Sequence, residues 1–167
     1  MEEANITLKL YQKVATRGGG IARVFTDAAR DNYTQGFIDS KKPGKQLVIE
    51  ARNMDGKITA ELYCFSPSSK SFSHVLSDLT IVVASFNNDQ GLEEKIFAHL
   101  LEYLENSRPD ILRVELLVRE ENLSLLALYK TLGFELEGRF ANQIYNSQKQ
   151  FEAGIQMVWA NEKFLQP

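Results

Sequence analysis

The chain has 167 residues, of which 44% are hydrophobic and 25% are charged, as is ordinary for a globular protein with a substantial buried core. Its net charge of −3 argues against nucleic acid as a partner, because a nucleic acid backbone attracts a basic face. No apolar run approaches the length of a membrane span. We therefore expect one domain over residues 1–167.

The cysteine content is evidence on the cellular compartment in which the protein works. Cys64 is the only cysteine, so the chain cannot form an internal disulfide. It lies in a largely apolar run over 58–65, where we expect a strand residue in a reducing environment and not a nucleophile. Residues 1–5 are acidic and lack the hydrophobic region of a signal peptide. These features predict a cytoplasmic protein.

The first half of the chain is rich in predicted strands. Alternating or continuous apolar residues predict strands at 6–11, 46–51, 58–65 and 79–84. A helix is predicted over 21–33, where apolar residues recur at helical spacing. Between the second and third strands lies Asp55-Gly56, a dipeptide typical of a hairpin turn.

The second half alternates helices with strands. A helix after Gly91 would place five apolar side chains on one face, namely Ile96, Phe97, Leu100, Leu101 and Leu104. A second helix is predicted over 123–132, with Asn122 as its N-cap and Gly133 as its left-handed stop. The remaining strands are expected at 112–118, 134–140 and 154–160, with a hairpin loop over 141–151. This order predicts an α/β fold with a mixed central β-sheet flanked by helices.

The turn that joins the 79–84 strand to the next helix carries the first functional signal. It is polar and contains one glycine, Gly91. A strand–turn–helix of this kind directs the free N–H groups of the helix start toward one spot beside the end of the strand. Such a spot suits a phosphate group, and the glycine lets the backbone approach an anion closely.

Two segments resemble the GNAT N-acetyltransferase superfamily. Residues 122–134 match the family pattern N-x-x-A-x-x-L-Y-x-x-x-G-F, with Leu125 in place of the alanine. Residues 88–93 fall on the family's pyrophosphate turn, Q/R-x-x-G-x-G/A, with Gly91 as its first glycine. The likeness extends over nearly the whole chain and implies a GNAT-like domain whose strands splay at the cofactor site.

The resemblance also implies a co-substrate, acetyl-CoA, and roles for individual residues. Tyr129 would be catalytic, giving a proton to the leaving thiolate of coenzyme A, and its phenol with an ordinary pKa of about 10 suits that role. Its alternative role is packing in the core. The cofactor-binding residues implied by the family are Ile81, Val82, Val83, Asn88, Asp89, Gln90, Gly91, Leu92, Glu93, Asn122 and Tyr129.

The departures from the family pattern leave a second hypothesis open. Asn88 replaces glutamine or arginine, and Glu93 replaces the second small residue. At about 6 Å and an effective dielectric constant near 20, a carboxylate opposes each negative charge of a diphosphate by roughly 3 kcal/mol before screening. Asp89 adds another acidic group. The chain would then be either an enzyme or a GNAT-like binding or regulatory module that has lost acetyl-CoA. A chance likeness is the third alternative.

The acceptor and the general base stay open at this point. The likeness implies transfer to a primary amine on a small molecule or a protein, by direct attack, and a possible homodimer. Glu50, Glu61 and Asp78 are candidate bases, and nothing in the sequence chooses among them. His74 could lie near the strand ends that face the substrate, whereas His99 is expected in solvent. No residue spacing indicates a metal site.

Overall fold

The computed structural model describes residues 46–67, 69–83, 91–145 and 150–165. The strand expected at 6–11 and the helix expected over 21–33 lie outside these residues. The described elements are, in chain order, β1 (Gln46–Arg52), β2 (Ile58–Phe65), the 3-10 helix η1 (Lys70–Phe72), β3 (Val75–Val83), α4 (Leu92–Ser107), β4 (Arg113–Arg119), α5 (Leu123–Thr131), β5 (Glu135–Tyr145) and β6 (Phe151–Ala160).

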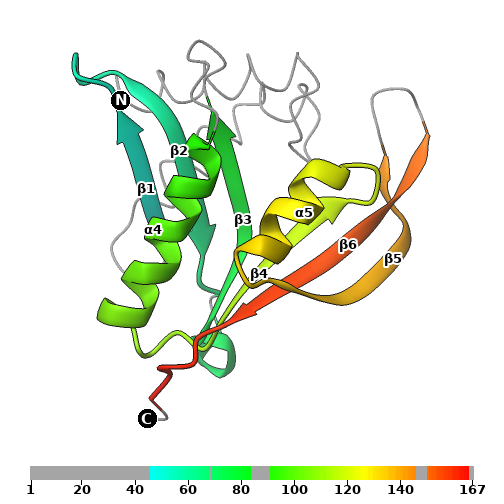
Figure 1. The fold of residues 1–167 in the computed structure, drawn as a ribbon. Coiled ribbons are helices and arrows are strands. Elements are labelled where there is room, and N and C mark those ends of the chain that lie inside the picture. The colour runs from blue at the N-terminus through cyan, green and yellow to red at the C-terminus, as the bar shows by residue number, and fades with distance from the viewer. Residues whose placement is uncertain (1–45, 68, 84–90, 146–149, 166–167) are drawn as a thin grey trace.

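The strands form one mixed six-stranded sheet in the order β1-β2-β3-β4-β6-β5. All neighbours are antiparallel except β3 and β4, which run parallel at the centre of the sheet. The helices α4 and α5 follow β3 and β4 in the chain, and both lie in front of the sheet in Figure 1. The predicted α/β fold is confirmed.

The hairpin of β1 and β2 forms where Asp55-Gly56 predicted it. Gly56 has a φ of 76°, a left-handed conformation that glycine adopts without strain. The side-chain carbonyl of Asn53 accepts hydrogen bonds from the backbone N–H groups of Asp55 at 3.1 Å and Lys57 at 2.9 Å. The turn is therefore closed by its own side chains, which sets the register of the two strands.

The core lies between the sheet and α4. The five apolar residues predicted on one face of this helix are the five that it buries: Ile96, Phe97, Leu100, Leu101 and Leu104. They pack with alternate residues of the strands beneath, among them Leu62 of β2 and Leu116 of β4. Burying each such side chain contributes about 1.5–3 kcal/mol, so the hydrophobic stripe is what fixes α4 on this face.

The last two strands are longer than predicted. The expected loop at 141–151 is mostly strand, because β5 continues to Tyr145 and β6 begins at Phe151. The sequence did not predict this longer strand because a bulge interrupts it. Between the pairs Phe140–Gly154 and Ile144–Glu152, β5 has two more residues than β6. Asn142 lies within this bulge with a φ of 56°. The extra residues interrupt the alternation on which the prediction depended.

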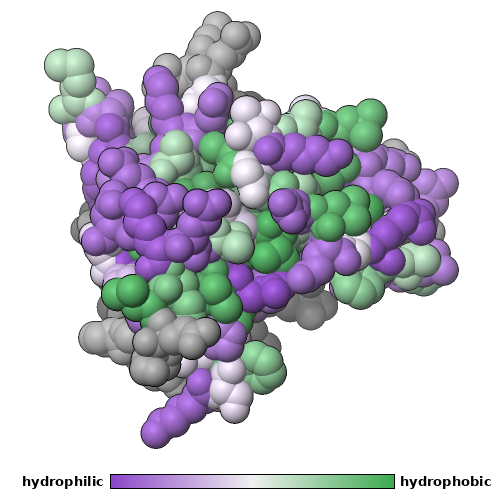
Figure 2. Space-filling view, turned by 60° about the horizontal axis from the view of Figure 1, so that its bottom comes forward, coloured by the Kyte–Doolittle hydropathy of each residue, from purple (hydrophilic) through white to green (hydrophobic). Residues whose placement is uncertain are grey.

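The surface of the described residues mixes polar and apolar side chains. Figure 2 shows hydrophilic residues over much of one face, with hydrophobic patches between them. The large exposed apolar side chains come from several elements, including Phe72 of η1, Leu123 of α5 and Phe151 of β6. Among the described helices, none is long and apolar enough to cross a membrane.

Candidate active site

The two parallel strands at the centre of the sheet diverge along their length. They pair only through Val75 with Arg113 and Leu76 with Val114, at the start of each strand. From there β3 and β4 separate, as Figure 1 shows. We call the unpaired remainder, residues 77–83 of β3 and 115–119 of β4, the splayed region. The splay implied by the family resemblance is confirmed.

A bulge in β3 lies where the divergence begins. β3 has one residue more than β2 between the pairs Tyr63–Thr80 and Phe65–Ser77. Asp78 lies in this bulge with a φ of 51°, a left-handed conformation that aspartate tolerates better than most residues. A bulge bends its strand and increases the local twist. The polar pair Ser77-Asp78 also explains why the sequence predicted β3 only from residue 79.

Beyond the bulge, β3 has one paired edge and one free edge. Ile81, Val82 and Val83 pair with β2 through Leu62, Glu61 and Ala60. Within the described residues, no ladder covers their other edge, which faces β4. Main-chain N–H and C=O groups at a free edge can pair with an extended ligand. Their predicted role in binding the cofactor is therefore compatible with the geometry.

The helix α4 begins beside the end of β3. Its N-cap is Gly91, with a φ of 101°, and within the described residues no N-cap side chain bonds to the first N–H groups of the helix. Leu92 and Glu93 are half-buried, whereas Glu94 is exposed. The other predicted residues of this turn, Asn88, Asp89 and Gln90, lie outside the described residues.

Asn122 caps α5, as predicted. Its side-chain carbonyl accepts hydrogen bonds from the N–H of Leu125 at 3.2 Å and from the hydroxyl of Ser124 at 3.0 Å. Gly133, with a φ of 87°, follows the helix as the predicted left-handed stop. The cap holds α5 beside the C-terminal end of β4, next to the splayed region. A contact between Asn122 and the cofactor stays a prediction.

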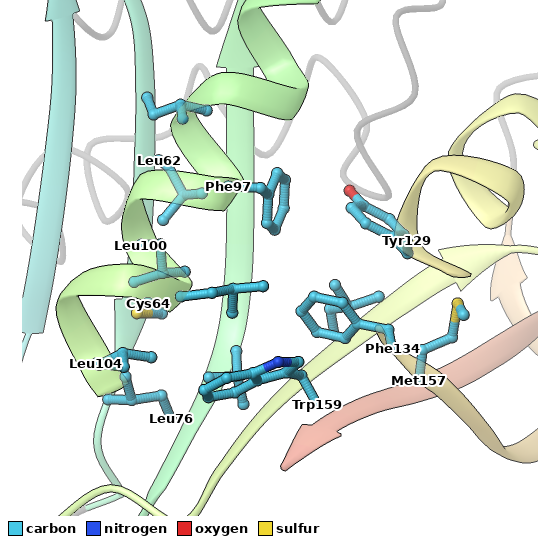
Figure 3. Close-up of a cluster of buried hydrophobic side chains, with 14 of the residues drawn as sticks. Leu62, Cys64, Leu76, Phe97, Leu100, Leu104, Tyr129, Phe134, Met157 and Trp159 are labelled. Carbon is cyan, nitrogen blue, oxygen red and sulfur yellow. The ribbon is translucent and has the colours of Figure 1, made fainter. Parts of the chain in front are cut away.

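Tyr129 is the one side chain that α5 buries, at 4% exposure. Its ring lies 5.0 Å from that of Phe97 and 5.7 Å from that of Phe134, centroid to centroid. Figure 3 shows the ring reaching from α5 toward α4, with the hydroxyl pointing away from Phe134 and Trp159. No hydrogen bond to this hydroxyl occurs among the described residues. The ring thus packs in the core, as the alternative role expected. The role of the hydroxyl as a proton donor stays a prediction.

The pKa of Tyr129 lies above its usual value. Burial is the main cause, and the negative charge of Glu93 is the second. A phenol in this environment stays protonated at neutral pH and can donate a hydrogen bond, while its raised pKa makes it a weaker acid than a free tyrosine. Burial also raises the pKa of Glu93. The proximity of Glu93 to Tyr129 was not predictable from the sequence, since it depends on how α4 and α5 pack.

The other titratable candidates lie elsewhere. His74 precedes β3, and its carbonyl accepts a hydrogen bond from the N–H of Leu112 at 2.8 Å. It is therefore at the paired end of β3, opposite the splayed region, and its predicted position near the substrate is wrong. His99 is exposed, as predicted. Burial raises the pKa of Cys64 to about 12, so this thiol is not a nucleophile at neutral pH.

The three candidate bases occupy different surroundings. Glu50 and Glu61 are cross-strand neighbours in β1 and β2. Glu61 is fully buried, and it alternates with Ala60 and Leu62, which pack in the core under α4, so it points to the opposite face of the sheet. Asp78 is exposed at the bulge. No geometry favours one of them as the base. Within the described ranges, no group of three or more His, Cys, Asp or Glu side chains could hold a metal ion.

A hollow of about 630 Å³ lies away from these groups. Its lining includes Arg113, Glu135 and Trp159, at the paired end of β4 and the adjoining ends of β5 and β6. Its acidic side chains are exposed or ion-paired, as in the contact between Arg113 and Glu137 at 2.6 Å. Our candidate for the active site is instead the splayed region, with the unpaired main chain of β3, the start of α4 and the side chain of Tyr129.

Comparisons with known proteins identify the family and the fold. The sequence model of the acetyltransferase (GNAT) domain matches residues 25–155. No curated protein sequence matches the chain. Among solved structures, a GNAT-family acetyltransferase from Streptococcus pneumoniae is 19% identical, with a TM-score of 0.74, and the match covers 95% of this chain and 94% of that one.

Two further solved structures have the same fold at lower identity. Ribosomal-protein-alanine N-acetyltransferase from Brucella melitensis is 17% identical, with a TM-score of 0.77 over 95% of this chain and 94% of that one. A phosphinothricin acetyltransferase from Sinorhizobium meliloti, in complex with AcCoA, is 11% identical, with a TM-score of 0.77 over 96% of this chain and 84% of that one.

Proposed function

The chain belongs to the GNAT acetyltransferase family, and from this premise we propose that it moves an acetyl group from acetyl-CoA to a primary amine. The observation that carries the proposal is the buried Tyr129, whose hydroxyl has no hydrogen-bond partner among the described residues and points from α5 toward α4 in Figure 3. The family match favours an enzyme over the non-catalytic alternative. The proposed domain spans residues 1–167.

The proposed donor site uses main chain and helix ends. The free edge of Ile81–Val83 would pair with the amide groups of the pantetheine arm, as a strand pairs with a sheet edge. The start of α4, with the residues 88–93, would hold the diphosphate. Asn122 would contact the pantetheine arm from the start of α5. The unpaired edge of β3 suits the amide groups of the pantetheine arm. In contrast, the carboxyl group of Glu93 in the first turn of α4 opposes the negative charge of the diphosphate.

The proposed chemistry is direct attack by the neutral amine on the thioester carbonyl. The new C–N bond forms, the C–S bond breaks, and the departing thiolate takes a proton from the Tyr129 hydroxyl. The amine gives up a proton to a base that the geometry does not identify, and Tyr129 is reprotonated from solvent. An N–H of β3 near Val83 would stabilise the oxyanion that develops on the carbonyl oxygen.

The acceptor belongs to one of two classes, a small-molecule amine or a protein amino group. Structural neighbours named for each class share this fold, so the fold does not choose between them. The net charge of −3 is compatible with a cationic acceptor and argues against nucleic acid. We place the protein in the cytoplasm, because its one cysteine is a buried free thiol. A homodimer is compatible with the exposed apolar side chains of β5 and β6.

Release of free CoA from acetyl-CoA tests the proposal. We expect release to require an added amine, either from a panel of small primary amines or from a peptide with a free N-terminus and a lysine. Mass spectrometry should find the acceptor heavier by one acetyl group. If the folded protein binds CoA but acetylates no amine in either class, the proposed acceptor chemistry is wrong.

A further inference from the structure

Glu93 and Tyr129 face the same space from two different helices. Glu93 lies four residues before Phe97, so the two side chains share a face of α4, one turn apart. The Phe97 ring contacts Tyr129 at 5.0 Å. In Figure 3, the Tyr129 hydroxyl points toward α4. The charge of Glu93 is the second cause of the raised pKa of Tyr129, whose side chain is more than nine-tenths buried and whose hydroxyl makes no hydrogen bond among the described residues.

No cation among the described residues neutralises Glu93. On α4, Glu94 and Lys95 are exposed, and on α5 the exposed Lys130 follows the buried Tyr129. Arg108, whose charge acts on Cys64, lies at the opposite end of α4. The strands beneath the helix contribute apolar side chains to the core, namely Leu47, Ile49, Ala51, Ala60, Leu62, Leu79, Ile81 and Val83. Tyr129 is thus the titratable group that faces Glu93 within the described ranges.

The position of Glu93 conflicts with an anionic ligand. Residues in the first turn of α4 surround the free N–H groups that would bind the diphosphate. An ionised carboxyl group there repels the diphosphate, whereas a protonated one does not. Because Glu93 is half-buried, its charge is poorly screened, and burial moves its titration above the usual range of a glutamate.

We propose that Glu93 makes binding of the acyl donor depend on pH, opposing the diphosphate when ionised and admitting it when protonated. This inference rests on the proposed function. It assigns Glu93 a part in donor selection and not in the chemical step. The contribution of Glu93 to the dissociation constant for CoA then increases as the pH rises through the titration of this carboxyl group.

Glu94 provides a matched control. It is the next residue of the same helix turn and carries the same charge, but it is exposed. Glu93→Gln removes the charge from the donor site with almost no change in shape, and Glu94→Gln removes the same charge from solvent. Comparing the two separates the effect of the buried charge from a change in net charge or in the helix dipole.

Calorimetric titration with CoA at several pH values from 5 to 8.5 tests the inference. The phosphates of CoA titrate in the same way for all three proteins, so the ratio of dissociation constants between variants isolates the protein group. We expect Glu93→Gln to bind CoA about tenfold or more tightly than the wild type at pH 8. The ratio should fall as the pH decreases from 8.5 to 5, and Glu94→Gln should match the wild type throughout.

The outcomes separate this inference from the proposed function. If wild type and Glu93→Gln bind CoA with the same affinity across the pH range, the role of Glu93 is wrong and the acetyl-CoA site stands. A ratio that does not change with pH, or an equal effect of Glu94→Gln, also overturns the inference. If neither protein binds CoA at any pH while both unfold cooperatively on heating, the proposed function fails together with the inference.

Discussion

Replacing Tyr129 by phenylalanine removes one oxygen atom and leaves the aromatic packing in place. The ring contacts to Phe97 and Phe134, at 5.0 and 5.7 Å, do not involve the hydroxyl. Because that hydroxyl has no hydrogen-bond partner among the described residues, its loss should change the free energy of unfolding by less than about 1 kcal/mol. The fold and the donor site should therefore survive the substitution.

The effect on catalysis should be much larger than the effect on stability. Loss of a proton donor to the leaving thiolate should lower kcat by roughly 10²-fold, equivalent to about 2.7 kcal/mol of transition-state stabilisation. The KM for acetyl-CoA should change little, because the main chain of β3 and the start of α4 would still bind the donor. Initial rates of CoA release at saturating amine, with varied acetyl-CoA, separate the two parameters.

Two comparisons make this test decisive. Tyr145→Phe removes a hydroxyl from an exposed ring on β5 that packs on Phe151, and its kcat should equal that of the wild type. Tyr129→Ala would lose the buried ring and about 3–5 kcal/mol of stability, so its inactivity would not be informative. A kcat for Tyr129→Phe within twofold of the wild type would refute the role of Tyr129 as the proton donor.

Three further predictions concern individual groups. Asn122→Ala removes the cap of α5 and should lower the free energy of unfolding by about 1 kcal/mol, measured by urea denaturation; an unchanged midpoint would contradict the cap. Burial raises the pKa of Glu93, so its contribution to stability is present below the pKa of the unfolded state and is lost as pH rises through the folded pKa. The melting temperature of Glu93→Gln minus that of the wild type should therefore increase from pH 4 to pH 8. A difference in melting temperature that does not change with pH would contradict the raised pKa of Glu93. The Cys64 thiol, with its pKa raised to about 12, should react with a thiol reagent only after denaturation, and rapid reaction of the native protein would contradict its burial.

Local signals in the sequence predicted much of the fold. The apolar stripe of α4, the Asp55-Gly56 turn and the Asn122 cap depend on neighbours within a few residues in the chain, and all three are confirmed. The order of strands and helices was enough to predict the mixed sheet. These features are determined by spacing and by short-range hydrogen bonds, which are visible in a single sequence.

The missed features depend on tertiary structure. Asp78 and Asn142 have φ values of 51° and 56° in bulges, and neither residue is a glycine that would have marked the position. As a result, the start of β3 and the length of the β5–β6 hairpin were predicted wrongly. The electrostatic influence of Glu93 on Tyr129 acts between two helices, so only their packing reveals it. The departure of Glu93 from the family pattern was visible, but its surroundings were not.

A crystal structure of the protein with bound CoA tests the central claim most directly. We predict that the pantetheine arm pairs with the free edge of Ile81–Val83 and that the sulfur atom lies within hydrogen-bond reach of the Tyr129 hydroxyl. CoA bound at another place, or a splayed region filled by side chains of the protein itself, would contradict the account.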